Sequence, residues 1–420
     1  MRKTRISAAA ALMTAAVMTL SSCSFKHMIV MQSRRDISVP TTISFSWWGS
    51  EARNSYTLEG IRTFEKDYDS RLEVHSFPYD FEGYKSNLDA LVRSGKEYDI
   101  MQLNSSWVQS LTQDYDALYD LNELSDYIEL SNFSDEQLSY CTVDGKLCGL
   151  PTSLNALTFY HNTLLYANYE LNPPTTWDEL FAAAEVMSPD GVYVLESNVK
   201  HYWIMSIAHE EQLTGRSAFG DGFDAENVVS MMEFYKSLRD EKVIPTETYT
   251  KELFFEGGCA SEVMWVSDAE FYAEPLNSQG GLLQVGSCLK SDDQKRTGWY
   301  VKPNQVYSIK KSTEHPEEAA QLLNFLVNDS RMAKLQGTEK GIPLSSSALE
   351  VLEANNMLNG ASYEAGKLIN DNISSYELMP AQLEETERYE AFFEQFTLFD
   401  SGEKTAQQAA EDFVAEYPFT

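Results

Sequence analysis

Residues 41–103 alternate between two spacings of apolar side chains. Ile43, Phe45 and Trp47 take turns with small polar residues, which is the two-residue period of a strand. Each such stretch is followed by apolar residues three and four positions apart, the period of an amphipathic helix. Strands that alternate with helices are typical of a parallel sheet covered on both faces. The pattern predicts an α/β fold with strands at 43–47, 72–77 and 98–103 and helices at 58–68 and 84–92.

A second region follows Gly149-Leu150-Pro151. Apolar residues at 154, 157 and 159 indicate a strand, and Pro173-Pro174 interrupts the chain. Thr176 followed three residues later by Glu179 is the pattern of a capping box, which predicts that a helix begins there. Further helices are expected at 228–238, at 316–327 and in the tail 363–420.

The composition supports a folded chain of more than one domain. The 420 residues correspond to about two to three domains at ~150 residues each, and the 12% of aromatic residues supply apolar surface to bury. The formal net charge of −32 repels phosphate backbones and anionic headgroups, which argues against nucleic-acid binding.

No sequence motif for catalysis or cofactor binding stands out. Six histidines are present, but Leu213 occupies the position where a zinc-protease motif beginning at His209 needs a second histidine. The chain has neither a phosphate-binding glycine loop nor a Gly-x-Ser-x-Gly elbow, so we expect no metal and no cofactor. Close acid pairs arise by chance among 64 acidic residues, so a two-carboxylate glycosidase is neither indicated nor excluded.

The first 23 residues are organised like an export signal. Arg2, Lys3 and Arg5 precede an apolar run to Leu20 that is shorter than the ~20 residues of a membrane span. Leu20-Ser21-Ser22-Cys23 resembles the bacterial lipobox, in which the cysteine after the cleaved bond receives a diacylglycerol. We expect residues 1–22 to be a signal peptide and residues 23–40 a tether lipidated at Cys23. An ordinary secretory peptide with a chance cysteine is the alternative.

Four cysteines remain in the exported chain, a number that permits pairing. Cys141 and Cys148 flank Asp144-Gly145, a strong hairpin signal that would place them opposite each other, close enough for a disulfide. Cys259 and Cys288 form the leftover pair. Four free thiols are the alternative, which the sequence leaves open.

Tryptophans stand where strands of the expected sheet end. Trp48 follows the first strand and Trp107 follows the third, and ligands of open parallel sheets gather outside these strand ends. Trp47 is in phase with Ile43 and Phe45, so we expect it in the core. Trp48 is out of phase, and its aromatic face could stack on a ligand.

Several motifs in the same order resemble the extracellular solute-binding proteins of family 1, the substrate-binding lipoproteins of sugar ABC transporters. No single motif is specific, but their order and spacing over residues 41–345 make the resemblance strong. The tail after residue 350 adds little. The motifs are Ser46-Trp47-Trp48-Gly49 with Arg53, Tyr98–Trp107, Val143–Pro151 with Asn155, Pro173–Leu180, Phe254–Ala260 and Ile309–Leu326.

The resemblance implies a two-lobe, periplasmic-binding-protein-like α/β fold with discontinuous lobes, a hinge and a cleft between the lobes. Lobe 1 is expected at 41–150 and 289–345, and lobe 2 at 151–288 and 346–420. By the same resemblance, the ligand-binding residues carried over to this chain are Trp48, Arg53, Asn104, Trp107, Asn155, Trp265 and Asp268. Trp203, Trp299 and Tyr307 are aromatic candidates by position alone, with the core as the other location.

The function that follows is capture of a sugar or oligosaccharide and its delivery to the permease subunits of an ABC importer. The protein is expected to be a monomer, anchored by lipid on the extracytoplasmic face of the cell membrane, and not an enzyme. A surface glycoside hydrolase and a sensory carbohydrate-binding lipoprotein are the alternatives. The acidic surface favours a neutral ligand.

Overall fold

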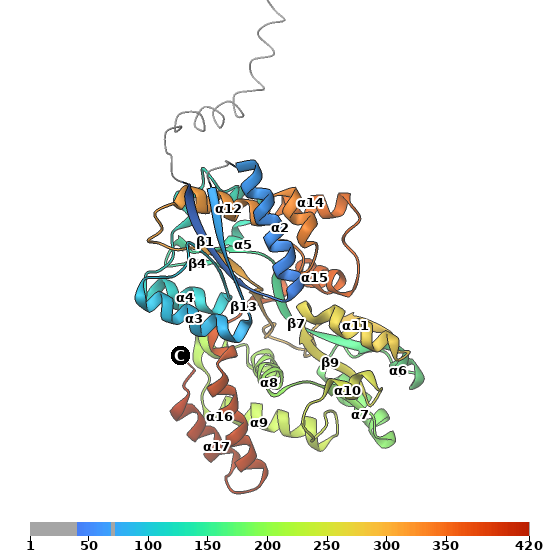
Figure 1. The fold of residues 1–420 in the computed structure, drawn as a ribbon. Coiled ribbons are helices and arrows are strands. Elements are labelled where there is room, and N and C mark those ends of the chain that lie inside the picture. Colours follow the sequence, from blue (N-terminus) through green and yellow to red (C-terminus); the bar gives the residue numbers. More distant parts are fainter. Residues whose placement is uncertain (1–39, 69–71, 420) are drawn as a thin grey trace, which may run out of the picture.

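A computed structural model of the chain describes residues 40–68 and 72–419 (Figure 1). The expected signal peptide, the lipidation site Cys23 and the tether up to residue 39 lie outside these residues. Within the described part of the chain, every helix is too short or too polar to span a bilayer.

The first sheet has the strand order β2-β1-β3-β12-β6. β1 (Thr41–Trp48) pairs in parallel with β2 (Leu72–Tyr79) and β3 (Ile100–Leu103). β12 (Val306–Ile309) then runs antiparallel to β3 and to β6 (Leu150–Pro151). The parallel half confirms the strand–helix alternation expected from the sequence.

Helices cover this first sheet in the upper part of Figure 1. Helix α3 illustrates how the local sequence sets their ends: the Asp80 carboxylate accepts a hydrogen bond from the Gly83 N–H at its start, and Gly95 takes a left-handed conformation (φ 65°) at its end. The helices of this lobe are α2 (Glu51–Tyr68), α3 (Phe81–Ser94), α4 (Ser105–Gln113), α5 (Asp135–Ser139), α12 (Pro316–Asn328), α13 (Ser330–Gln336) and α14 (Ser346–Ala354).

The second sheet is built around the long strand β7, in the order β13-β11-β7-β9-β8, with β10 also paired to β7. Its strands are β7 (Leu154–Asn162), β8 (Tyr193–Glu196), β9 (Cys259–Trp265), β10 (Leu283–Gly286), β11 (Tyr300–Pro303) and β13 (Glu377–Leu378). Its helices are α6 (Thr163–Asn168), α7 (Trp177–Met187), α8 (Val199–Thr214), α9 (Ala225–Asp240), α10 (Lys251–Phe255), α11 (Ala269–Ser278), α15 (Ala361–Asp371), α16 (Thr386–Asp400) and α17 (Ala406–Glu416).

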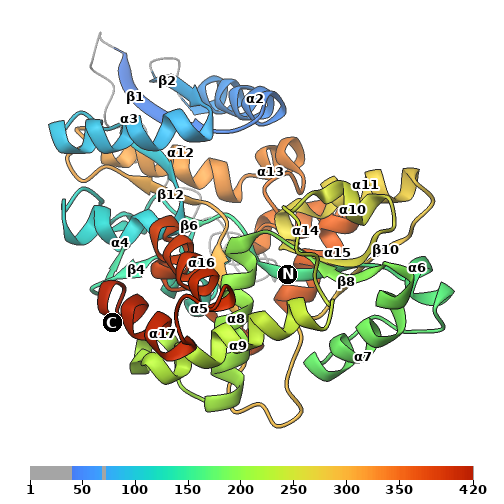
Figure 2. The ribbon, with the colours of Figure 1, turned by 90° about the horizontal axis from the view of Figure 1, so that it is seen from below.

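The two faces of β7 belong to different hydrophobic cores. Leu157 and Phe159 face a core shared with α8, α9, α16 and α17, which lie together in Figure 2. Ala156 and Tyr160 face the other core, which continues across the lobe junction into the first lobe. Because side chains alternate along a strand, β7 is buried throughout and holds the two cores together.

The chain passes between the sheets at places that partly differ from the expectation. The first passage lies between Pro151 of β6 and Leu154 of β7, next to residue 150, where the family resemblance implied the end of the first part of lobe 1. The second was expected near Cys288, but β11 still belongs to the second sheet, so the passage lies between Pro303 and Val306. The third lies after α14, which packs on α12 and α13, rather than near Ser345.

The Asp144-Gly145 hairpin is confirmed by the pairing of β4 (Thr142–Val143) with β5 (Lys146–Leu147). The Cys148 N–H donates to the Cys141 carbonyl at 2.9 Å, so the two cysteines do lie together. Their thiols are nevertheless free, as are those of Cys259 and Cys288. The structure therefore agrees with the alternative expectation, in which these four cysteines are free thiols.

Helix α7 begins where the capping pattern predicted, although the cap is formed differently. The Thr176 hydroxyl accepts from the Glu179 N–H at 3.1 Å, as expected. The Glu179 carboxylate, however, accepts from the N–H and hydroxyl of Thr175, one residue before the N-cap. These hydrogen bonds from Thr175 lower the pKa of Glu179.

Candidate ligand-binding site

Two tryptophans meet where parallel strands of the first sheet end. Trp48 is the last residue of β1, and Trp107 lies in the first turn of α4, directly after β3. Since β1 and β3 are parallel neighbours, their carboxyl ends share one edge of the sheet. The two ring centroids are 5.7 Å apart, so the structure brings these two expected residues together.

Two aromatic residues of α3 complete this cluster, which we call the aromatic platform: Trp48, Phe81, Tyr84 and Trp107. The ring of Phe81 lies 5.5 Å from Trp48 and 6.0 Å from Trp107, almost parallel to the latter at 20°. Phe81 is 48% exposed, whereas Trp48 is only 8% exposed. Phe81 therefore supplies the most open face of the platform, and the Lys85 ammonium lies 5.7 Å from the Trp107 ring.

Sequence reasoning missed Phe81 and Tyr84. Phe81 lies just after the end of β2. In the same way, Trp48 is the last residue of β1, and Trp107 lies just after β3. The rule that ligands gather at the carboxyl ends of parallel strands would have found it, had the rule been applied to all three strands.

Asn104 has a structural task between β3 and α4. It is the N-cap of α4, and its side-chain oxygen accepts from the N–H and the hydroxyl of Ser106, both at 3.2 Å. The half-buried Asn104 thus holds the first turn of α4, and with it Trp107, at the sheet edge.

Arg53 and Asp268 lie on different lobes, and the charge of Arg53 acts on the Asp268 carboxyl. Arg53 lies in the first turn of α2, and its Nη2 donates to the Glu339 carbonyl at 3.2 Å. Asp268 directly precedes α11 of the second lobe. Burial raises the pKa of the Asp268 carboxyl, and the positive charge of Arg53 acts in the opposite direction. The pair therefore places opposite charges across the lobe junction.

Asn155 connects β7 to the turn after β9. Its Nδ2 donates to the Ser267 hydroxyl at 3.2 Å, and its Oδ1 accepts from the Ser267 N–H at 3.3 Å. With 5% exposure, its amide is mostly occupied by this reciprocal contact. Asn155 thereby orients the turn that carries Asp268.

Trp265, the last residue of β9, lies among cations rather than on the platform. The Lys302 Nζ is 4.4 Å and the Lys200 Nζ 5.3 Å from its ring. Both ammonium groups bind Glu384, at 2.5 Å for Lys200 and 2.6 Å for Lys302. Burial acts to raise the pKa of Glu384, but the two ammonium groups lower it, and the net shift is downward. Among the described residues, no ring contact joins Trp265 to the platform.

A buried lysine that the sequence did not single out ties the junction together. Lys340 is 1% exposed, and its Nζ donates to Gln102 Oε1 at 3.0 Å and to the Tyr307 hydroxyl. Its carbonyl accepts from Ser153 and Asn304, one in each of the first two passages between the sheets. Burial holds the pKa of Lys340 well below its usual range. Nothing in the sequence signals this, because a lysine in a turn is normally exposed.

The other aromatic candidates are core residues. Trp203, Trp299 and Tyr307 are at most 3% exposed. Trp47 is fully buried as expected, and its indole N–H donates to Asn54 at 2.9 Å.

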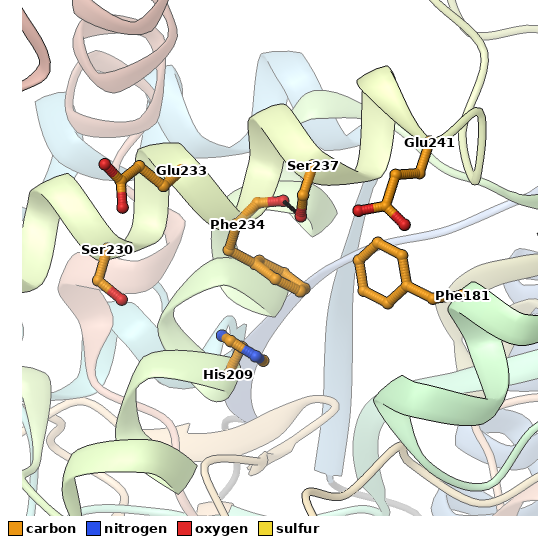
Figure 3. Close-up of a pocket in the computed structure, with 7 residues that line it drawn as sticks. All are labelled: Phe181, His209, Ser230, Glu233, Phe234, Ser237 and Glu241. Carbon is orange, nitrogen blue, oxygen red and sulfur yellow. Dashed lines mark hydrogen bonds between the residues drawn. The ribbon is translucent and has the colours of Figure 1, made fainter.

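A separate hollow of about 390 Å³ lies on the outer helical layer of the second lobe (Figure 3). The His209 ring stacks on Phe234 there, with centroids 3.9 Å apart. None of the expected ligand residues lines this hollow, so it is distinct from the platform. Its lining residues are Phe181, His209, Ser230, Glu233, Phe234, Ser237 and Glu241.

Comparison with protein families gives one match over most of the chain. The model of the bacterial extracellular solute-binding proteins matches residues 60–359. A curated relative, an uncharacterised ABC transporter extracellular-binding protein from Pyrococcus horikoshii, is 23% identical over 243 residues. That match covers 53% of this chain and 54% of the relative, so it spans about half of each.

Solved structures are similar over nearly the whole fold. A periplasmic solute-binding protein from Pectobacterium atrosepticum is 26% identical, with 90% of this chain and 97% of that one covered and a TM-score of 0.81. An oligogalacturonide-binding protein from Yersinia enterocolitica, in complex with saturated digalacturonic acid, is 28% identical, with 89% and 97% covered and a TM-score of 0.76. The GacH receptor of Streptomyces glaucescens shares the fold at 16% identity, 90% and 98% coverage and a TM-score of 0.69.

Proposed function

This chain belongs to the bacterial extracellular solute-binding proteins, and we propose that it captures an oligosaccharide between its two lobes for an ABC importer. The family and the two-lobe fold support its role as the extracytoplasmic solute-binding component of such a transporter. The single observation that carries the choice of ligand is the aromatic platform at the edge of the first sheet.

The platform suits a sugar because sugar rings have apolar C–H faces and a rim of hydroxyl groups. A C–H face can lie against an aromatic ring while the hydroxyls bond to polar side chains. The indole of Trp107 and the exposed ring of Phe81 are nearly parallel, with centroids 6.0 Å apart. Such an extended surface favours a ligand of more than one sugar ring.

Polar groups at the junction complement the platform. Arg53 offers several directed donors from the first lobe, and Asp268 offers a carboxylate from the second. A ligand that bonds to both favours the arrangement in which the lobes are close together. Ligand binding would therefore shift the protein towards a closed form, which the permease can recognise.

Two ligand classes follow from the charges. A neutral oligosaccharide is our first choice, since the chain carries a net charge of −32 and the charge of Arg53 is opposed by Asp268. An acidic oligosaccharide is the second, favoured by the donors of Arg53 and by the Yersinia neighbour, whose ligand is digalacturonic acid.

The remaining parts of the proposal concern the membrane. Diacylation of Cys23 would keep the protein beside its permease on the outer face of the cell membrane, with residues 23–40 as the tether. A lipid anchor restricts the receptor to the surface, so that binding and delivery occur close to the transporter.

A thermal-shift screen tests the proposal, because a ligand that binds only the folded state raises the apparent melting temperature. The panel contains neutral oligosaccharides, oligogalacturonides and the monosaccharides of both. We expect a shift with at least one oligosaccharide and a smaller shift with its monosaccharide. Product analysis of the same mixtures distinguishes a receptor from a glycosidase: release of shorter sugars over time would favour the enzyme.

A further inference from the structure

Two glutamates lie side by side in the interior of the second lobe, apart from the aromatic platform. Glu196 ends β8 and Glu262 lies in β9, and the parallel pairing of these strands places the two residues in register. Their exposures are 1% and 0%. Paired neighbours on adjacent strands point to the same face of a sheet, so both carboxyl groups enter one buried site.

Each carboxyl group has one occupied oxygen and one oxygen without a partner. Glu262 Oε1 accepts from the hydroxyls of Tyr249 and of Tyr272, the latter at 2.8 Å. Glu196 Oε1 accepts from the Thr250 N–H at 3.1 Å. The Oε2 atoms of both glutamates are buried and, among the described residues, have no hydrogen-bond partner.

The groups around the pair do not neutralise two negative charges. The positive charge of Lys251 in α10 acts to lower the pKa of Glu262. The negative charge of Glu252 in the same helix acts to raise the pKa of Glu196. No ion pair to either glutamate is formed within the described chain. The other titratable groups that face the pair are the weak acids Tyr249, Tyr272 of α11, Cys259 of β9, Tyr160 of β7 and Tyr202 of α8.

Protonation of the carboxyl groups removes the repulsion between two buried negative charges. A neutral, protonated carboxyl group removes this charge, whereas two buried carboxylates would repel each other without a counterion. Burial raises the pKa of Glu262 to about 8, and Glu196 adds to this increase. Burial also raises the pKa of Glu196 to about 7.

We propose that Glu196 and Glu262 form a buried, protonated pair that acts as a pH-sensitive lock on the segment 245–250. The geometry points to this segment because Tyr249 and Thr250, which lead into α10, donate to the two carboxyl groups. When the two carboxyl groups lose their protons, the carboxylates repel each other and are better solvated by water than in the interior. Both effects favour separation of this segment from β8 and β9.

The direction of the pH effect follows from the raised pKa values. Unfolded glutamates ionise near pH 4.3, so between that pH and about 8 the folded chain holds more protons than the unfolded chain. The contribution of the pair to stability is complete below the unfolded pKa and is lost as pH rises through 7 and 8. Each extra proton changes the unfolding constant about tenfold per pH unit.

Urea unfolding of the full chain between pH 5 and 9 tests the proposal. We expect Glu262→Gln to be much less pH-dependent than the wild type, with at least a tenfold smaller rise in the unfolding constant from pH 5.5 to pH 8. Glutamine keeps the shape and still accepts from the tyrosines, but it cannot ionise. Glu274→Gln, which changes an exposed acid of α11, is the control and should follow the wild type.

A second measurement does not depend on the variant being folded. Carboxyl ¹³C spectra of the wild-type chain should contain two glutamate signals that titrate above pH 6. The Thr250 amide should also lose hydrogen-exchange protection between pH 6 and pH 8, after correction for intrinsic exchange. If every glutamate titrates below pH 5.5, or if Glu262→Gln and wild type show the same pH dependence, the proposal is wrong.

Discussion

Phe81 combines an exposed apolar ring with close aromatic neighbours. It is 48% exposed, although the rings of Trp48 and Trp107 lie within 6.0 Å. Exposure of a large aromatic residue costs favourable burial, so a ligand that covers the ring recovers this free energy. The same contacts hold the ring in position before a ligand arrives, which reduces the entropy lost on binding.

We therefore expect Phe81→Ala to weaken oligosaccharide binding by ~1–2 kcal/mol and Trp107→Ala by ~1–3 kcal/mol, the range for covering a large apolar side chain. Calorimetric titration with the oligosaccharide found in the screen measures this. Phe271→Ala is the matched control, since Phe271 is 53% exposed on the second lobe and lies outside the platform. Equal affinities for all four proteins would show that the platform is not the binding surface.

Helix α3 carries Phe81 in its first turn, so the cap of this helix bears on the site. Asp80 is the N-cap of α3 and accepts from the Gly83 N–H at 2.7 Å. Phe81 is the residue that directly follows this cap. Loss of the cap would loosen the first turn and with it the position of the ring.

Asp80→Ala should lower the free energy of unfolding by about 1 kcal/mol, the usual cost of removing an N-cap. It should also weaken ligand binding slightly, because Phe81 would be less well positioned. Chemical unfolding compares it with Asp89→Ala, which removes an exposed aspartate from the middle of the same helix. If Asp89→Ala lowers the free energy of unfolding by as much as Asp80→Ala, the effect comes from the lost negative charge and not from the lost N-cap.

The elements were predictable from the sequence wherever local periodicity decides them. β1, β2 and β3 and the helices between them lie where the sequence pattern placed them. In β2 and the helices one face is buried and the other is not, which is what gives the spacing its period. β11 fell in the expected first lobe because the lobe bounds followed the family resemblance and not a local pattern. Tyr300–Pro303 is buried at every position, and a short fully buried strand carries no periodic signal of the sheet it joins.

The site was predictable only in part. Trp48 and Trp107 follow from strand ends, and the structure brings them together. The side-chain amide of Asn155 is largely occupied by hydrogen bonds to Ser267. Lys340 ties the junction together through hydrogen bonds to Gln102 and Tyr307, which are distant in sequence. Such long-range contacts are not encoded in any local pattern.

At the scale of the whole molecule, the proposed membrane attachment would depend on Cys23, which lies outside the described part of the chain. We expect Cys23→Ala to move the protein from the membrane fraction to the medium or soluble fraction. The reason is that the proposed lipid on Cys23 would hold the chain at the bilayer, and alanine cannot carry it. Cys288→Ala is the control and should stay in the membrane fraction; mass spectrometry of its N-terminus reports the lipid. Release of both variants, or of neither, would contradict the anchor.

The central claim is that an oligosaccharide binds between the lobes and draws them together, with Arg53 and Asp268 contributed from opposite sides. Pulsed electron spin resonance tests it directly, with spin labels at Ser94→Cys of α3 and Ser278→Cys of α11, both exposed positions. The background carries Cys23→Ala and Cys288→Ala, because the half-buried Cys288 thiol is free and would also take a label. The account predicts that saturating oligosaccharide converts the label distances into one narrower and shorter distribution, and that Trp107→Ala needs more ligand to reach it. An unchanged distribution in a chain that calorimetry shows to be saturated would contradict it.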